Sequence, residues 1–219
     1  MYKKLFVAFL ALVICGTAGA DLYVNIGTSG GGWPSAPYII TPDQTSDVPN
    51  WMPSMFPTFC VERWRYFSSS PGDYWATIDD MILYGGDAST VDLDAAPDPL
   101  LAKTKQIYAA FLNGALVEGG QAIDGNIVQT SIWGAQLYED SHGDTYEINN
   151  TIESIIADSS AVAGWNNVKV LNLWRNANCT GDVQSQLVMT PVPGAGLLGA
   201  VGLGLASLRL RRRRATADA

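Results

Sequence analysis

The sequence predicts an α+β domain in which strands at both ends of the domain form one sheet, with a helical insertion at its centre. Strand-like segments occur in the first half of the domain and again at its end, where the last two segments alternate apolar with polar residues as half-buried strands do. Between them, apolar residues recur three, four and seven positions apart, which is the spacing of a helix face. An order of strands, then helices, then strands within about 170 residues is typical of one α+β domain.

Both ends of the chain predict sorting signals rather than parts of this fold. Residues 1–20 hold a lysine pair, an apolar run and the small-residue site Ala-Gly-Ala, as secretory signal peptides do. At the other end, a proline pair precedes the apolar run 197–208 and the arginine cluster 209–214. Arginines in this place are retained on the cytoplasmic side of a membrane. We therefore expect a signal peptide at 1–20, one extracytoplasmic domain at 21–190 and a sorting tail at 191–219.

The tail resembles a PEP-CTERM sorting signal, whose pattern is Val-Pro-Glu-Pro, an apolar span and arginines. Pro191, Val192 and Pro193 match the proline motif, with Val192 in place of glutamate, and "PGAGLLGAVGLGL" resembles the Gly-Ala-rich form of the span. The resemblance implies export across the inner membrane, transient anchoring there by an apolar transmembrane segment, and processing by an exosortase. It implies a final location at the cell surface or in the extracellular matrix.

The first half of the domain is predicted to hold two strands between two loops. Residues 27–57 are rich in Gly, Pro and Ser and favour an ordered loop. "TFCVERWRYF", residues 58–67, favours a strand because aromatic and β-branched residues fill it. "YWATIDDMILYGG" is also strand-like, and the loop 85–99 follows it.

Three helices and two strands are predicted in the second half. The helical spacing covers residues 99–117 and ends at a Gly-Gly pair. Further helices are expected at 125–138 and 146–163. The last two segments, "NVKVLNLW" and "DVQSQLVMTP", alternate apolar with polar residues and predict strands that join the earlier ones in a sheet.

The charge of the domain excludes one class of partner. The whole chain has a net charge of −8, but residues 21–190 hold six basic and 20 acidic residues, which gives a net charge of about −14. Nucleic acid and anionic membrane surfaces would be repelled. This balance suits an extracellular protein, and we expect no nucleic-acid partner.

Cys60 and Gln129 are the main candidate site residues. Cys60 lies on a predicted strand, and Gln129 lies three and four positions before Ile132 and Trp133, on their side of a predicted helix. Burying an amide without partners costs about 1–3 kcal/mol, so a glutamine beside these apolar residues calls for a reason.

The segments Phe59-Cys60-Val61-Glu62 and Gln129-Thr-Ser-Ile-Trp resemble the two signature motifs of bacterial thioester domains, although Ser131 stands where that family more often has alanine. The resemblance implies a bond between the Cys60 sulfur and the side-chain carbonyl of Gln129, formed with loss of ammonia. It implies a single-use covalent anchor for surface amines or hydroxyls rather than an enzyme. Such a bond needs a thiolate, an amide carbon at near-attack distance and exclusion of water. The apolar residues suited to exclude water are Phe59, Trp64, Ile132 and Trp133.

Two other states of Cys60 remain open. Cys179 is the other cysteine outside the signal peptide, and a Cys60–Cys179 disulfide is an alternative in an oxidising compartment. A buried thiol without a covalent partner is the third state. The disulfide would suit a non-reactive structural protein of the exopolysaccharide matrix.

The remaining candidates have weaker support, and we expect no cofactor and no metal. His142 stands among Glu139, Asp140 and Asp144, but their spacing lacks the ladder of a calcium loop and favours a solvated turn. Asp79 and the acids that follow it offer paired carboxylates with no defined separation. The many tryptophans and tyrosines favour a core over a sugar-stacking face.

Overall fold

The computed structural model describes residues 22–28, 36–62, 72–83, 97–137 and 145–191. The signal peptide, the arginine cluster, Val192 and Pro193 lie outside these ranges, and Pro191 is the last described residue. Within the described ranges, no helix has the length and apolar character needed to span a membrane.

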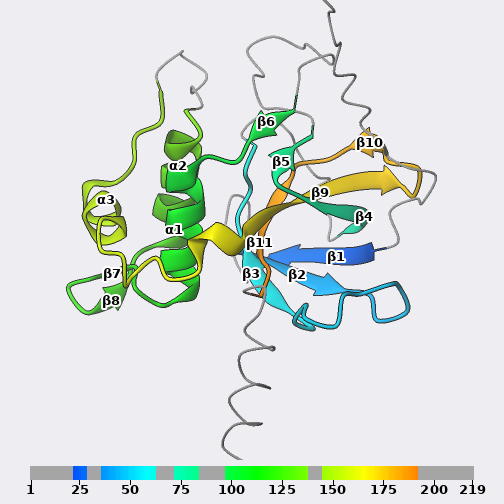
Figure 1. Ribbon diagram of the computed structural model, residues 1–219, viewed down its shortest axis with the longest axis horizontal. Helices are drawn as coiled ribbons and strands as arrows, with labels where there is room; N and C mark the ends of the chain where they lie inside the picture. Colours follow the sequence, from blue (N-terminus) through cyan, green and yellow to red (C-terminus); the bar gives the residue numbers. More distant parts are fainter. Residues whose placement is uncertain (1–21, 29–35, 63–71, 84–96, 138–144, 192–219) are drawn as a thin grey trace, which may run out of the picture.

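Seven antiparallel strands form the main sheet, in the order β10-β9-β4-β1-β2-β3, with β11 also paired to β9 (Figure 1). The central pairing joins β4 and β9, which come from the two halves of the chain. The prediction that early and late strands meet in one sheet is therefore confirmed. The strands are β1 (Leu22–Thr28), β2 (Tyr38–Pro42), β3 (Phe56–Thr58), β4 (Gly72–Asp79), β9 (Val168–Asn176), β10 (Thr180–Asp182) and β11 (Gln186–Met189).

The sheet is nearly closed, because its two free edges approach each other after β3 and before β11. The Val61 N–H donates to the Ser185 carbonyl at 2.9 Å, and the Leu187 N–H donates to the Phe59 carbonyl at 3.2 Å. Between these two bonds, Cys60 and Gln186 form an isolated antiparallel bridge. We call this junction, residues 58–62 and 184–187, the seam.

Three helices lie together on one side of the sheet (Figure 1). They are α1 (Ala102–Leu112), α2 (Gly125–Ala135) and α3 (Asn150–Ile156), and a short 3-10 turn η1 (Trp165–Asn167) precedes β9. Two small hairpin sheets, β5 (Met81–Ile82) with β6 (Asp98–Pro99) and β7 (Val117–Glu118) with β8 (Gln121–Ala122), complete the described elements. The mixed α+β class is thus confirmed, with all three predicted helices present.

The third helix is shorter than predicted at both ends. The Asn149 side chain accepts hydrogen bonds from the first turn of α3 and fixes its start. At the other end, the Asp158 carboxylate binds the backbone N–H and hydroxyl of Ser160, which favours a turn over further helix. Gly164 then adopts a left-handed conformation, with φ of 81°.

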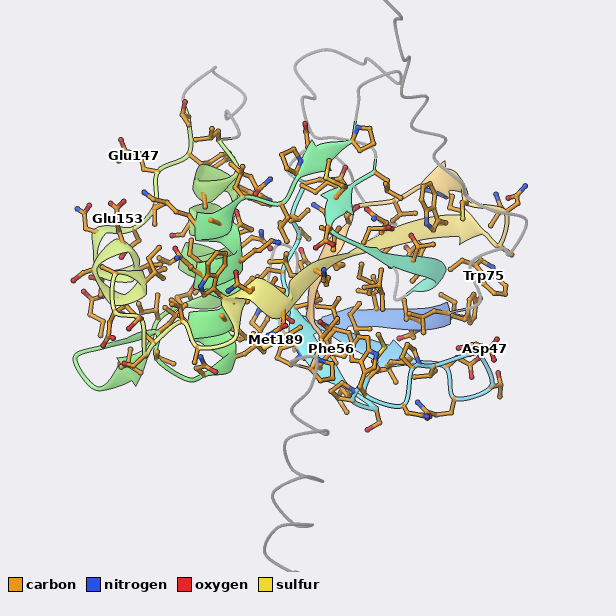
Figure 2. All side chains as sticks on the ribbon, viewed as in Figure 1. Asp47, Phe56, Trp75, Glu147, Glu153 and Met189 are labelled. Carbon is orange, nitrogen blue, oxygen red and sulfur yellow. The ribbon has the colours of Figure 1, made fainter. Side chains whose placement is uncertain are left out.

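Two apolar cores lie on the two faces of the sheet. One core packs the helices against the outer face and includes Phe59, Val61 and Leu187. The other fills the interior enclosed by the curved sheet and includes Cys60, Tyr38 and Leu171. Figure 2 shows the side chains of both halves, with Glu147 and Glu153 on the helical side and Trp75 and Asp47 at the far end of the sheet. The cysteine at the seam therefore points to the interior, away from the helices that its neighbours contact.

Candidate functional site

The seam places the Cys60 and Gln186 side chains directly opposite each other. The two backbone bonds that flank the bridge make Cys60 and Gln186 a non-hydrogen-bonded antiparallel pair. Residues in such a pair have Cα atoms about 4.5 Å apart and side chains on the same face, closer than at any other position of a ladder. The backbone register alone thus brings a thiol and a primary amide together.

The Cys60 sulfur is surrounded by polar partners although only 1% of the residue is exposed. Its S–H donates to the Gln184 side-chain oxygen at 2.9 Å, and the Gln186 Nε2 donates to the sulfur at 3.4 Å. The amide carbon of Gln186 is one C–N bond beyond that nitrogen, so it lies within about 4.7 Å of the sulfur. The Tyr38 hydroxyl is a third hydrogen-bond partner of the thiol.

Gln129 binds the backbone of Cys60 rather than its sulfur. The Cys60 N–H donates to the Gln129 side-chain oxygen at 2.9 Å, and the Gln129 Nε2 donates to the Cys60 carbonyl at 2.7 Å. These two backbone groups point away from β11, because Cys60 is a non-hydrogen-bonded partner of Gln186. The amide from α2 therefore takes the place of a neighbouring strand at Cys60, which is the reason for burying a polar side chain there.

The three glutamine amides differ in how fully they are engaged. Both ends of the Gln129 amide are bonded to Cys60. The Gln184 amide is also fully used, because its nitrogen donates to the Glu62 carbonyl while its oxygen accepts from the thiol. The Gln186 nitrogen donates to the Gln184 carbonyl at 3.3 Å, which is long for an N–H···O bond, and to the Cys60 sulfur at 3.4 Å. Its buried oxygen has no hydrogen-bond partner among the described residues.

The structure thus brings the predicted residues Cys60 and Gln129 into contact and adds two glutamines that the sequence reasoning missed. The cross-link between Cys60 and Gln129 stays a prediction. The available signal for Gln184 and Gln186 was their position two residues apart in a segment that otherwise reads as a half-buried strand. Both are at least 95% buried, at 5% and 0% exposure.

Burial dominates the electrostatics of the thiol. It raises the pKa of Cys60 to about 12; hydrogen bonds from Gln186 and Tyr38 act in the opposite direction, and the charge of Glu62 raises the pKa further. The same burial raises the pKa of Tyr38 above its ordinary value. Cys60 is therefore a protonated thiol at neutral pH and needs a proton acceptor before it can act as a nucleophile.

Glu62 brings a carboxylate into this buried region. Its side chain is fully buried, and one oxygen accepts a hydrogen bond of 2.6 Å from the backbone N–H of Ser185. Ser185 lies between the two glutamines whose side chains contact the sulfur. The seam therefore holds a thiol, a carboxyl group and two primary amides, and Gln129 of α2 adds a third amide to the same buried cluster.

The apolar residues expected to exclude water from the Cys60 sulfur lie in two different cores of the domain. Phe59 is fully buried, but it packs on the helical side, edge-on to Phe111 at 4.8 Å. Ile132 is fully buried in the same core. Trp133 packs against the interior core that contains Cys60 and also contacts the ring of Tyr146. Trp64, the fourth expected residue, lies outside the described ranges.

Cys60 and Cys179 are not joined by a disulfide, and each belongs to a different cluster. Cys179 packs with Trp174 in the turn before β10 and has a left-handed backbone, with φ of 56°. The disulfide alternative therefore has no counterpart in the structure.

Of the weaker carboxylate candidates, the Asp79-Asp80 pair and Asp98 lie in the described part of the chain, Asp98 in β6. Asp80 is ion-paired with Lys169, and the Asp79 carboxylate accepts hydrogen bonds from Thr77 and Asn172. The Asp79 and Asp80 carboxylates are therefore occupied by structural hydrogen bonds and an ion pair with residues of β4 and β9. His142 and its acidic neighbours lie outside the described residues, and within those residues no group of three or more potential ligands could hold a metal ion.

No protein-family profile matches the chain, and no curated protein matches it. The function of the seam must therefore be derived from its own geometry.

Proposed function

We propose that this protein is a cell-surface or extracellular-matrix protein that attaches covalently to its target through an internal thioester formed by Cys60. One observation carries the proposal: the buried Cys60 sulfur lies in contact with primary amides of glutamine. A thiol and an amide held together in a dry site have the components of an acyl-sulfur bond.

Gln186 is the acyl donor that the geometry favours. It is the cross-strand partner of Cys60, and its side-chain nitrogen contacts the sulfur. Its side-chain oxygen has no hydrogen-bond partner among the described residues. Among the described residues, loss of ammonia from Gln186 breaks one long hydrogen bond to the Gln184 carbonyl and the contact with the Cys60 sulfur, which the new bond replaces. The same loss from Gln129 would break the 2.7 Å bond that holds the carbonyl of Cys60, and a buried group left without its partner costs about 1–3 kcal/mol.

The proposed function follows from the chemistry of the acyl-sulfur bond. A thiol is a better leaving group than an amine because it is the stronger acid. A target amine that reaches the carbonyl carbon displaces the sulfur and remains bonded to the glutamine side chain, while Cys60 returns to a thiol. Each molecule reacts once, so the protein is an anchor for surface amines or hydroxyls.

The sorting tail supplies the location in this proposal. Export by the signal peptide and processing near Pro191 by an exosortase bring the domain to the cell surface. Pro191, the first residue of the predicted sorting tail, is exposed, as a cleavage site requires. A chain in which Arg209–Arg214 is deleted should be released without cleavage or misrouted, as judged by the C-terminal peptide of the secreted protein.

Intact mass and methylamine uptake test the thioester. The mature domain should weigh about 17 Da less than its sequence, because ammonia leaves when the bond forms. Methylamine should then add to one glutamine and expose one thiol in equal amounts, and peptide mapping should place it on Gln186 rather than on Gln129. Gln186→Ala should abolish both signals. Cys179→Ser is the matched control and should leave both unchanged.

The second candidate, a non-reactive matrix protein, makes the opposite prediction. A mature domain of full mass that takes up no methylamine would contradict the thioester. Recovery of Cys60 and Cys179 in one linked peptide would establish the disulfide of the structural alternative. Methylamine on Gln129 would uphold the thioester and refute the assignment of Gln186.

A further inference from the structure

We propose that Glu62 carries the proton in both the formation and the opening of the thioester. This inference rests on the proposed function, since it names the group that makes the same bond possible. Glu62 lies two residues beyond Cys60 on the seam, and its side chain has no exposed surface. Burying a carboxylate is costly unless it is paired and hydrogen-bonded, and Glu62 accepts a hydrogen bond from the Ser185 N–H.

The contacts of Glu62 place its carboxyl group against the backbone between Gln184 and Gln186, the two glutamines that contact the Cys60 sulfur. Its Oε2 accepts from the N–H of Ser185, the residue between Gln184 and Gln186. Its backbone carbonyl accepts from the Gln184 amide, whose oxygen accepts the S–H of Cys60. One hydrogen bond thus links the Glu62 carboxyl group to the backbone next to Gln186. Another links the Glu62 carbonyl to the Gln184 amide that accepts the Cys60 S–H.

The site needs a base of this kind. A thiol with a pKa of about 12 is almost entirely protonated at neutral pH, and only the thiolate attacks an amide carbon. The leaving group also needs an acid, because NH₂⁻ does not depart without a proton. One carboxyl group that first accepts and then returns a proton meets both needs.

The step balances without any outside reagent. Glu62 accepts the proton of the Cys60 thiol as the sulfur attacks the side-chain carbonyl carbon of Gln186. The carbon–nitrogen bond then breaks, Glu62 returns the proton to the departing nitrogen, and ammonia leaves. The products are the thioester, ammonia and the original carboxylate. No atom is oxidised or reduced.

Attack by a target amine is the same reaction in reverse. The amine must lose a proton as it bonds to the carbonyl carbon, and the sulfur must gain one as it leaves. By microscopic reversibility the group that serves one direction serves the other, so Glu62 takes the proton from the amine and gives it to Cys60.

Two substitutions separate this role from a structural one. Glu62→Gln keeps the size of the side chain and an oxygen for the Ser185 N–H, but it removes the base. Glu62→Asp keeps the base and shortens the side chain. The rate of the 17 Da mass loss, which marks departure of ammonia, is followed by intact mass after cell-free synthesis of the domain. Thermal unfolding of each variant reports whether it is folded.

We expect folded Glu62→Gln to form the bond about 10²- to 10⁴-fold more slowly than the wild type, which is the usual contribution of general acid–base catalysis. Glu62→Asp should complete the reaction at an intermediate rate and should take up methylamine more slowly than the wild type. The direction of the rate change in Glu62→Gln distinguishes proton transfer from a purely electrostatic effect. If Glu62 acted only through its charge, Glu62→Gln would lower the pKa of Cys60 and speed the reaction.

Three results would overturn the inference. An equal or higher rate in Glu62→Gln would show that no proton passes through this side chain. Loss of the reaction in both variants would show that the shape of the site, not its base, is required. A wild-type protein that shows no mass loss would refute the proposed function itself, and the inference with it, whereas the first two results leave the thioester intact.

Discussion

Replacing Gln129 with alanine tests whether its amide holds the backbone of Cys60 in place. The substitution removes one acceptor at 2.9 Å and one donor at 2.7 Å from the two backbone groups of a residue that is 1% exposed. Each buried group left without a partner costs about 1–3 kcal/mol. The free energy of unfolding should therefore fall by about 2–6 kcal/mol, against about 5–15 kcal/mol for a whole domain.

The measurement is urea unfolding of the mature domain in a Cys60→Ser background, so that no cross-link contributes to stability. Gln44→Ala is the matched control, because Gln44 is exposed and its amide makes one hydrogen bond, to the Pro42 carbonyl. We expect that control to change stability by less than about 0.5 kcal/mol. If Gln129→Ala costs no more than Gln44→Ala, the reasoning about the backbone of residue 60 is refuted.

Gln129→Glu adds a pH-dependent test of the same contacts. A protonated carboxyl keeps both bonds to Cys60, whereas a carboxylate faces the Cys60 carbonyl oxygen without a proton to donate. Folding therefore raises the pKa of this side chain above its unfolded value of about 4.3. The stability from these bonds should be fully present below that pH and should be lost as the pH rises through the folded value. A variant equally stable at both ends of this range would contradict the contacts.

Three further substitutions test the fold around the site. Gly125→Ala should lower the free energy of unfolding by more than about 2 kcal/mol in urea, because its Cβ would lie 1.9 Å from a backbone oxygen. Gly27→Ala is the control: a Cβ there meets open space, so this variant should be close to neutral in the same assay. Thr58→Val should cost about 1–3 kcal/mol, since the hydroxyl both donates to and accepts from the backbone of β11, and faster amide exchange at the seam should accompany the loss. Asp80→Asn should lower stability by less than about 1 kcal/mol in thermal unfolding, because the carboxylate is 63% exposed. Lys169 lowers the pKa of Asp80, so the small difference in stability between wild type and variant should vanish as the pH falls below about 4.

The elements predicted best from the sequence are those with a strong local signal. The helix α1 lies inside the predicted range 99–117, because its apolar spacing is regular and its buried face packs on the sheet. The start of α2 agrees with the prediction, and Asp124 caps it by accepting from the N–H of Asn126. The strand β2 was missed within the loop predicted at 27–57. Its five residues alternate buried and more exposed positions, but turn-forming residues on both sides hid that pattern.

The composition of the site was harder to predict because it depends on register. The helical position of Gln129 showed that its amide needed a buried partner, but not whether that partner was the backbone or the sulfur of Cys60. The contact between Cys60 and Gln186 arises only when the sheet curves enough for its edges to meet, over a separation of 126 residues. A shift of one residue in that pairing would turn Gln186 to the opposite face.

The position of β11 at the end of the domain has a mechanical consequence. Under the proposed assignment, a target would be bonded to the side chain of Gln186, and the proposed processing site near Pro191 follows only a few residues later. Tension between the target and a cell-bound C-terminus would then run through one short stretch of backbone and would bypass the rest of the sheet and the three helices. Such a load path would hold even if shear unfolded the remainder of the domain, because the chain that carries the force is covalent throughout.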